Sequence, residues 1–274
     1  MNTTRAVGTV GVIGAGRMGQ PIIGHMVRKG LAVVAHDVDA EKREAVATLG
    51  ATWADSQEAL GRGCDAILVC VGYDRELREV MSDAFLAGLP RETIVAVLST
   101  VHPRTVQELS EVAARVGVHL VDSTVCRGGR GADEGKLLSF VGGDIRTFER
   151  LKPVLACFCS DIVHSGAVGT AQAAKAANNL IMWACLIANH EALALAKRYG
   201  MDVDLLRESL MKTGAENGVL RHWGTSTMKW ADDDLDLVKQ MADEVGMRTP
   251  QAALDRDICR DLKPKKFQLD RYGV

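Results

Sequence analysis

The sequence lacks a strong excess of charge of either sign. Its 274 residues include 33 lysines and arginines and 35 aspartates and glutamates, which leaves a formal net charge of −2. Such near neutrality argues against nucleic acid as an obligatory partner. No uninterrupted apolar run approaches the ~20 residues of a membrane span, and the polar start Met1–Arg5 has no secretory hydrophobic segment behind it. We therefore expect a cytoplasmic protein with neither a nucleic-acid nor a membrane partner.

Paired cysteine spacings are also missing. The seven cysteines are odd in number and mostly lie in apolar segments, without the spacing of a zinc site. We expect reduced thiols and no metal site. The length is enough for one large domain or two ordinary ones, and no internal repeat stands out.

The first 165 residues alternate short β-rich apolar runs with amphipathic segments. This alternation predicts a doubly wound, mostly parallel sheet whose strands are joined by crossover helices. The expected strands are Thr9–Ile13, Val33–Asp37, Ala66–Val71, Ile94–Ser99, His119–Asp122 and Leu137–Val141. From about Ala167 onward, helix-forming residues dominate between scattered glycines. We therefore predict an α/β domain over 1–165 and an all-α domain over 166–274 that begins with a long interdomain helix.

A glycine-rich turn follows the first expected strand. It reads Gly14-Ala15-Gly16-Arg17-Met18-Gly19 and precedes a helix-compatible run. In such a turn the first glycine permits the tight bend, the second admits a pyrophosphate, and the third lets the helix pack on the sheet. The helix N-terminus then faces the phosphates. The motif predicts a dinucleotide site in a Rossmann domain.

Asp37, which ends the second expected strand, bears on the choice of cofactor. Its carboxylate can accept hydrogen bonds from an adenosine ribose but would repel a 2′-phosphate, so NAD is favoured over NADP. Lys42 and Arg43 nearby keep NADP open. Arg17 has two interpretations, since it could face the pyrophosphate or solvent. Val71-Gly72 and Ser99-Thr100 fall where the carboxyl edge of an open sheet lines its ligand crevice.

Lys175 and Asn179 lie four residues apart at the head of a long apolar segment. In a helix they would be about 40° apart and about 6 Å along one face, an arrangement suited to holding a hydroxyl. The apolar residues that follow predict a helix covered by protein on every side. An ammonium partly withdrawn from water loses basicity and can act as a general acid and base. A surface lysine with its stem along the helix is the alternative.

Three motifs together resemble those of the β-hydroxyacid dehydrogenase family, which includes 3-hydroxyisobutyrate dehydrogenases. They are the glycine turn, the pattern GxxGxxxxxKxxNN ending at Asn179, and the segment Asp122–Leu137, which is similar to DAPVSGGxxGAxxGxL. The resemblance covers nearly the whole chain. It implies Lys175 as catalytic acid and base with Asn179 beside it, Thr100 near the nicotinamide ribose, Val71-Gly72 against the cofactor, and a homodimer or homotetramer.

The resemblance also implies a substrate-binding segment. Its expected residues are Ser123, Thr124, Cys126, Arg127 and Gly128, together with Asn179. Cys126-Arg127 replaces the family's Ser-Gly, and the planar guanidinium of Arg127 could grip a carboxylate or sulfonate on a small anionic substrate. An arginine in a salt bridge at the domain edge is the alternative. Cys126 is expected to be a wall residue rather than a nucleophile, because hydride transfer needs no covalent intermediate.

The acidic run Asp232–Asp234 and His190 could each be taken for part of a functional site. Asp233 replaces a lysine that the family usually carries near cofactor or substrate. Consecutive residues Asp232–Asp234 diverge by about 100° each on a helix, so we expect N-capping of a helix rather than a metal site. His190 is fifteen residues from Lys175, about 22 Å along a helix, which excludes a proton relay.

The sequence thus predicts an NAD(P)-dependent oxidoreductase that transfers a hydride between nicotinamide and a small hydroxy acid or its aldehyde. Imine reduction on a similar fold is one alternative, against which Lys175 weighs. A non-catalytic dinucleotide-sensing protein is another, favoured by Asp233 and opposed by the Lys175–Asn179 pair. Decarboxylating 6-phosphogluconate chemistry would need a much longer helical part than this chain has.

Overall fold

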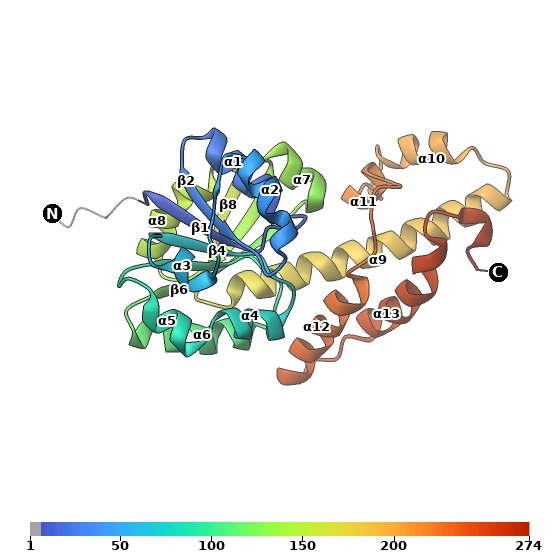
Figure 1. Cartoon of the computed structure of the whole chain (residues 1–274). Helices are drawn as coiled ribbons and strands as arrows, with labels where there is room; N and C mark the ends of the chain where they lie inside the picture. The colour runs from blue at the N-terminus through green and yellow to red at the C-terminus, as the bar shows by residue number, and fades with distance from the viewer. Residues whose placement is uncertain (1–6, 274) are drawn as a thin grey trace. The chain divides into compact units, whose positions relative to one another are not determined.

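The computed structural model describes residues 7–273 (Figure 1). Residues 1–6, which include the polar start, lie outside the described residues. The chain divides into two compact units, residues 1–175 and 176–274, and each is described by itself. Residues 166–175 group with the sheet rather than with the helices, because hydrogen bonds hold the start of the long helix to the sheet.

The first unit is built on one eight-stranded sheet of order β3-β2-β1-β4-β5-β6-β7-β8. Every neighbouring pair is parallel except β6 with β7. The strands are β1 (Thr9–Ile13), β2 (Ala32–His36), β3 (Thr52–Trp53), β4 (Ala66–Val69), β5 (Ile94–Val97), β6 (His119–Cys126), β7 (Leu137–Gly142) and β8 (Cys159–Gly166). The predicted fold class is confirmed, with all six expected strands present.

Two strands and one extension were not expected from the sequence. β3 has only two residues, too few for a pattern. β8 is mostly exposed or half-buried along its length, so it lacks an apolar run. β6 continues four residues beyond the expected end at Asp122, because Ser123–Cys126 pair with β7. Because Ser123 and Thr124 are polar, the apolar pattern of the sequence does not predict that the strand continues through them.

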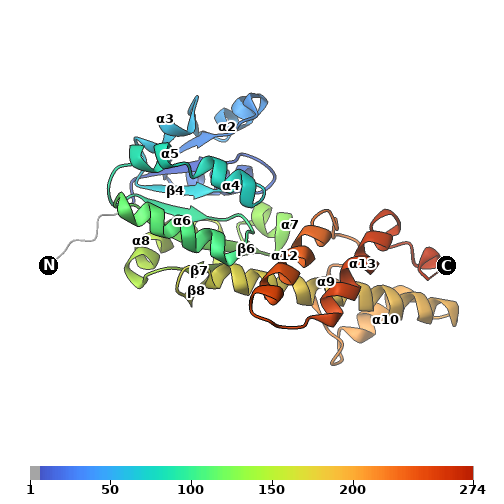
Figure 2. The same cartoon turned by 90° about the horizontal axis from the view of Figure 1, so that it is seen from below.

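Helices cover both faces of the sheet. One buried core joins the sheet to α1 (Gly19–Arg28), α2 (Arg43–Thr48), α7 (Gly128–Glu134) and α8 (Ile145–Leu155). A second core joins the opposite face to α3 (Gln57–Gly61), α4 (Asp74–Val80), α5 (Asp83–Gly88) and α6 (Pro103–Arg115), of which α4–α6 lie in front of the sheet in Figure 2. Several helices begin after a side chain that accepts a backbone N–H, as sequence patterns anticipate. These residues are Ser56, Ser82, His102 and Asp144.

The strand register brings five strand positions into line across the sheet. Ile13 is opposite both His36 and Val69, Val69 is opposite Val97, and Val97 is opposite Asp122. The segments that follow β1, β2, β4 and β5 therefore leave the sheet at one edge. This carboxyl edge is where open α/β sheets bind their ligands.

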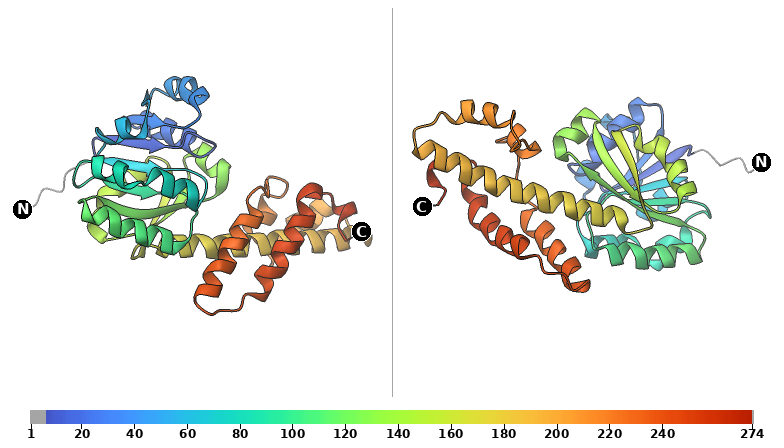
Figure 3. Two further views of the ribbon diagram at one scale, coloured as in Figure 1. Left: turned by 60° about the horizontal axis from the view of Figure 1, so that its bottom comes forward. Right: turned by 180° about the vertical axis from the view of Figure 1, so that it is seen from behind.

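The second unit consists of helices packed on the latter part of α9 (Thr170–Arg198) (Figure 3). The others are α10 (Val203–Leu210), α11 (Gly218–Arg221), α12 (Ala231–Glu244) and α13 (Pro250–Leu262). Trp183, Leu186 and Ile187 of α9 form a core with α11, α12 and α13. Within one chain, protein does not cover α9 on every side as expected, since Ile181 is 64% exposed and Leu195 60%.

By length and composition, α9 could cross a membrane, a criterion that the core helix of a globular protein also meets. Polar residues interrupt its 29-residue sequence, so it contains no long uninterrupted apolar run. Trp183, Leu186 and Leu193 on this helix are buried against other helices of the chain. Absence of a membrane partner and a cytoplasmic location remain predictions.

Candidate dinucleotide and substrate site

The presence of glycine at each of the three positions of the first turn has a different explanation. Gly14 has φ +100°, and a Cβ there would overlap the carbonyl oxygen of Cys70. A Cβ on Gly19 would overlap the carbonyl oxygen of Gly14, so the start of α1 lies directly against the turn. At Gly16 a Cβ would meet no protein atom within 4 Å. Nothing within the fold requires glycine there, and the open space fits a pyrophosphate approaching the backbone.

Asp37 lies directly after β2 and is tied to the glycine turn. Its carboxylate accepts hydrogen bonds from the Ala15 amide at 2.7 Å, the Asp39 amide at 2.9 Å and Lys42 Nζ at 2.9 Å. Burial opposes ionisation, but these hydrogen bonds outweigh it and hold the pKa of Asp37 below its ordinary value. The group is therefore an anion at neutral pH, with Lys42 as its counter-ion. Ala15 is buried, and Met18 is the N-cap residue of α1.

Arg17 has a partner that neither sequence interpretation included. Its guanidinium donates two hydrogen bonds to Asp133 on α7, at 2.6 and 2.7 Å. Both side chains are more than half exposed, so the pair is screened by solvent and salt. In this structure Arg17 therefore joins the glycine turn to α7 instead of extending freely into solvent.

The segments after β4 and β5 are fastened to each other. The Ser99 hydroxyl accepts a hydrogen bond from the Val71 amide at 3.0 Å and donates one to the Val71 carbonyl at 2.9 Å. Gly72 follows Val71, and Thr100 follows Ser99, so both expected cofactor residues lie at the carboxyl edge. Ser99, which the sequence placed only at the ligand-binding edge of the sheet, is the group that holds the two segments together.

Ser123 and Thr124 are directed into the fold. Both are fully buried. The Ser123 hydroxyl is 3.0 Å from that of Ser139 on β7, and Thr124 Oγ1 donates to the Ala171 carbonyl on α9 at 2.9 Å. The structure gives these hydroxyls internal partners, because residues of a central strand face the layers on either side of the sheet. Their contact with substrate stays a prediction.

Cys126 ends β6 as a buried thiol. Burial raises its pKa, while the positive charges of Lys175 and Arg127 lower it by less. The thiol is therefore protonated at neutral pH and is a poor nucleophile. This agrees with a wall residue. All seven cysteines of the chain are free.

Arg127 adopts a backbone conformation that usually requires glycine. Its φ is +82° and its ψ is +8°, in the left-handed region, where the family pattern carries glycine. Its guanidinium donates to the carbonyl of Lys136, just before β7, at 2.9 Å, and on β8 it contacts Ser160 Oγ at 2.7 Å and Asp161 at 2.8 Å. This pairing matches the salt-bridge alternative. Gly128, next in the chain, has open space where a Cβ would lie.

Asp122, at the carboxyl edge, holds the start of α9. Its fully buried carboxylate accepts hydrogen bonds from the Gly169 amide at 2.8 Å and the Gln172 amide at 3.0 Å. Burial raises the pKa of Asp122, although these backbone hydrogen bonds oppose the rise. The sequence contained Asp122 within the substrate-segment pattern, but no rule of spacing linked it to residues 47 and 50 positions later.

Lys175 extends from this anchored start toward the end of β6. Its Nζ donates a hydrogen bond to the Val125 carbonyl at 2.8 Å and is partly buried. Lys175 is therefore not a surface lysine lying along its helix. Asn179, one turn further along α9, is almost fully buried and its Oδ1 accepts from Asn178.

The acidic run and His190 have structural roles in the second unit. Asp232–Asp234 lie inside the first turn of α12, whose N-cap is Trp230, so the expected N-capping is wrong; acids there still favour the helix dipole. Asp234 accepts from Trp183 Nε1 at 2.9 Å. Within residues 7–273, no group of three or more histidine, cysteine, aspartate or glutamate side chains could hold a metal. His190 is buried against Phe267, whose amide donates to it.

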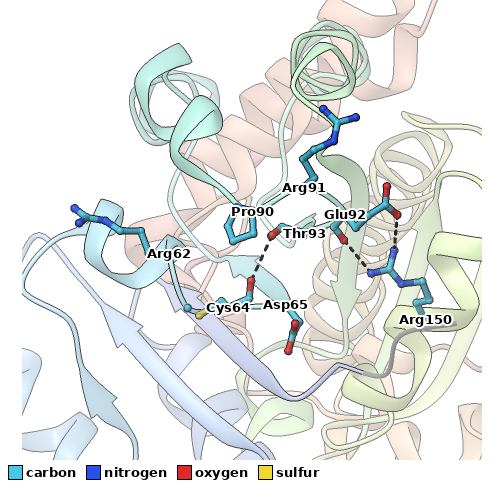
Figure 4. Close-up of a pocket in the computed structure, with 9 residues that line it drawn as sticks. Arg62, Cys64, Asp65, Pro90, Arg91, Glu92, Thr93 and Arg150 are labelled. Carbon is cyan, nitrogen blue, oxygen red and sulfur yellow. Dashed lines mark hydrogen bonds and ion pairs between the residues drawn. The ribbon is translucent and has the colours of Figure 1, made fainter. Parts of the chain in front are cut away.

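A hollow of about 100 Å³ lies at the opposite, amino edge of the sheet (Figure 4). Its lining comes from the segments that precede β4 and β5, together with Arg150 of α8. The arginines do not converge on it: Arg62 and Arg91 point away from each other, and Arg150 donates to the Glu92 carbonyl at 2.9 Å. None of the expected site residues lines this hollow.

The doubly wound sheet, its glycine turn and the helical second unit define a nucleotide-dependent dehydrogenase fold. Residues 9–169 match the family described as the NAD binding domain of 6-phosphogluconate dehydrogenase. Residues 169–268 match the family described as NAD-binding of NADP-dependent 3-hydroxyisobutyrate dehydrogenase. The chain belongs to the β-hydroxyacid dehydrogenase family of NAD(P)-dependent oxidoreductases acting on CH–OH groups.

Individual relatives agree with this assignment. The 3-hydroxyisobutyrate dehydrogenase of Pseudomonas aeruginosa is 28% identical over 268 residues, which cover 91% of this chain and 90% of that protein. The structure of Mycobacterium tuberculosis 3-hydroxyisobutyrate dehydrogenase with L-serine superposes with a TM-score of 0.87 at 24% identity, covering 95% and 94% of the two chains. An imine reductase from Myxococcus stipitatus has a TM-score of 0.69 at 21% identity, covering 94% of each. These two structures show a shared fold alone.

The backbone at Arg127 yields a stability prediction. Arg127→Gly and Arg127→Ala both lose the guanidinium contacts, but only glycine adopts φ +82° without strain. We expect the glycine variant to be more stable than the alanine variant by about 1–2 kcal/mol in urea unfolding. At Arg130, inside α7, the same pair of substitutions should show the opposite order. Equal stabilities of the two Arg127 variants would contradict the backbone argument.

Proposed function

We propose that the chain transfers a hydride between a nicotinamide dinucleotide and a small hydroxy acid, or its aldehyde, that carries a carboxylate or sulfonate. The observation that supports this most is the position of Lys175, whose amine is held at the end of β6 by the Val125 carbonyl. Val125 lies three residues beyond Asp122, on the same sheet edge from which the glycine turn emerges.

When bound, nicotinamide would supply the chemistry of accepting a hydride from the carbinol carbon of the hydroxy acid, or of donating one to the carbonyl carbon of the aldehyde. Lys175 would exchange its contact with Val125 for the substrate oxygen, taking the hydroxyl proton during oxidation and returning it during reduction. Asn179, one helical turn away, would donate an amide hydrogen bond to the same oxygen and orient it. Cys126 stays protonated and forms no bond to substrate.

The substrate class rests on family membership and on the open end of β6. The Pseudomonas aeruginosa relative is named for hydroxy-acid chemistry, and Gly128 leaves space for a small molecule where the strand ends. The side chains of Arg127 and Asp161 are about half exposed, so an anionic substrate could compete with Asp161 for the guanidinium. Cyclic imines are the competing substrate class.

Lys175→Ala tests the mechanism. We expect turnover to fall by roughly two to four orders of magnitude, the usual scale of general acid–base catalysis, with cofactor affinity little changed. Steady-state rates would be measured with 3-hydroxyisobutyrate, 4-hydroxybutyrate, L-serine, a hydroxysulfonate and a cyclic imine. Lys197→Ala, on the same helix and paired with Asp270, is the matched control.

Near-normal turnover of Lys175→Ala would remove the lysine from the mechanism. Turnover of the imine alone would replace hydroxy-acid oxidation with imine reduction. Cofactor binding by the wild-type chain without turnover of any of these compounds would favour a dinucleotide sensor.

We further propose NAD as the preferred cofactor. The Asp37 anion, bonded to the glycine turn through Ala15, would accept the adenosine ribose hydroxyls and repel a 2′-phosphate, although Lys42 offsets part of its charge. Asp37→Asn should therefore raise the affinity for NADPH relative to NADH by about tenfold, the size of one screened charge contact. Fluorescence titration with both cofactors measures the ratio, and Asp39→Asn is the neighbouring control. An unchanged ratio would overturn this assignment.

A second copy of the chain is the proposed partner, covering an apolar stripe on α9. Ile181, Ala188 and Leu195 are exposed and seven residues apart, so they share one helix face. Replacing Ile181 and Leu195 together by glutamate should lower the mass in solution to that of one chain, measured by light scattering. The same double replacement at exposed Val245 and Leu254 should leave the mass unchanged. A monomeric wild-type protein would refute the proposal.

A further inference from the structure

Gln172 is a fully buried side chain that bonds to the backbone on both sides of one residue. Its Oε1 accepts a hydrogen bond from the Val101 amide at 3.0 Å, and its Nε2 donates one to the Ser99 carbonyl at 2.9 Å. The residue between these two groups is Thr100. The carboxamide therefore pairs with the segment after β5 in the way that a neighbouring strand would, more than 70 residues away in sequence.

The backbone of Gln172 is held as firmly as its side chain. Its amide donates to Asp122, and the preceding carbonyl, that of Ala171, accepts from Thr124. Gln172 is therefore hydrogen-bonded both to β6, through its amide, and to the segment after β5, through its side chain. Lys175 follows three residues later, and residues three apart are neighbours on a helix surface.

Thr100 and Lys175 belong to opposite halves of the proposed reaction. Thr100 lies at the carboxyl edge, where the nicotinamide end of a dinucleotide would extend, while Lys175 would move the proton. Hydride and proton transfer require reacting atoms about 3–3.5 Å apart, and a displacement of about 1 Å costs on the order of a hundredfold in rate. A long lysine side chain cannot set this spacing alone, so the anchor of its helix must.

We infer that Gln172 is a positioning residue that keeps the Thr100 segment in register with Lys175. The inference rests on the proposed function for its effect on turnover. Its effect on cofactor binding does not, because the Thr100 segment would contact only the nicotinamide half of the cofactor. A purely structural glutamine would instead affect all ligands and the fold alike.

The test compares two ligands on Gln172→Met, which keeps the length of the side chain but cannot donate to Ser99 or accept from Val101. ADP contains the adenosine and pyrophosphate that the glycine turn would hold, whereas NADH adds the nicotinamide ribose and ring. We expect NADH to bind about tenfold more weakly, the scale of one buried polar group left unpaired, and ADP to bind within about twofold of wild type. Calorimetric titration measures both.

A matched control separates positioning from general loss of packing. Thr93→Val removes a different buried polar group, a hydroxyl that donates to the Cys64 carbonyl at the amino edge of the same sheet. It should change neither affinity. Gln172→Asn, whose amide is too short to span both backbone groups, provides a milder second variant if Gln172→Met does not fold, with the same expected difference between NADH and ADP.

Equal weakening of NADH and ADP, or unchanged NADH binding, in a folded Gln172 variant would overturn the inference. Amide hydrogen exchange at Val101 should accelerate in the variant without any ligand present, which checks the hydrogen bond directly. Because these measurements need no turnover, a chain that binds NADH but oxidises no hydroxy acid would refute the proposed function and leave this inference standing. Where turnover is found, kcat should fall about a hundredfold.

Discussion

The carboxylate of Asp122, fully buried and bonded to the amides of Gly169 and Gln172, is the constraint on which the site depends. Burying a carboxylate is unfavourable unless hydrogen bonds compensate, and here two amides at the head of α9 do so. A helix start with its orphan amides is in turn stabilised by an anion. Strand β6 and helix α9 therefore define each other's position, and Lys175 emerges one turn later at a set place.

Elsewhere along the carboxyl edge, single side chains likewise hydrogen-bond one segment to another. Ser99 fastens the segments after β4 and β5, Asp37 fastens the segment after β2 to the glycine turn, and Gln172 connects the segment after β5 with α9. Each of these side chains satisfies backbone groups that a ligand-binding loop would otherwise leave unpaired. The backbone around the open positions Gly16 and Gly128 is thus hydrogen-bonded on neighbouring segments of the edge.

Local patterns were sufficient for the fold class. Apolar runs predict β1, β2, β4, β5 and β7 directly, and those of β1, β4 and β5 are almost fully buried. In the glycine turn, the close approach of backbone atoms explains Gly14 and Gly19. Local patterns were insufficient for β6 beyond Asp122, where Ser123 and Thr124 are polar yet buried. The polarity is tolerated because Ser139 and the Ala171 carbonyl satisfy both hydroxyls, and those partners come from β7 and α9.

By itself, the sequence determined the kinds of group available: a glycine turn for phosphates, an acid after β2, a lysine and an asparagine one helical turn apart. Those features are local, so spacing and residue type are enough to recognise them. Only the tertiary structure decided which groups meet. It paired Arg17 with Asp133 and Arg127 with Asp161, and it turned Ser123 and Thr124 inward. Hydrogen-bond partners far apart in sequence are chosen by strand register and helix packing, which no local pattern encodes.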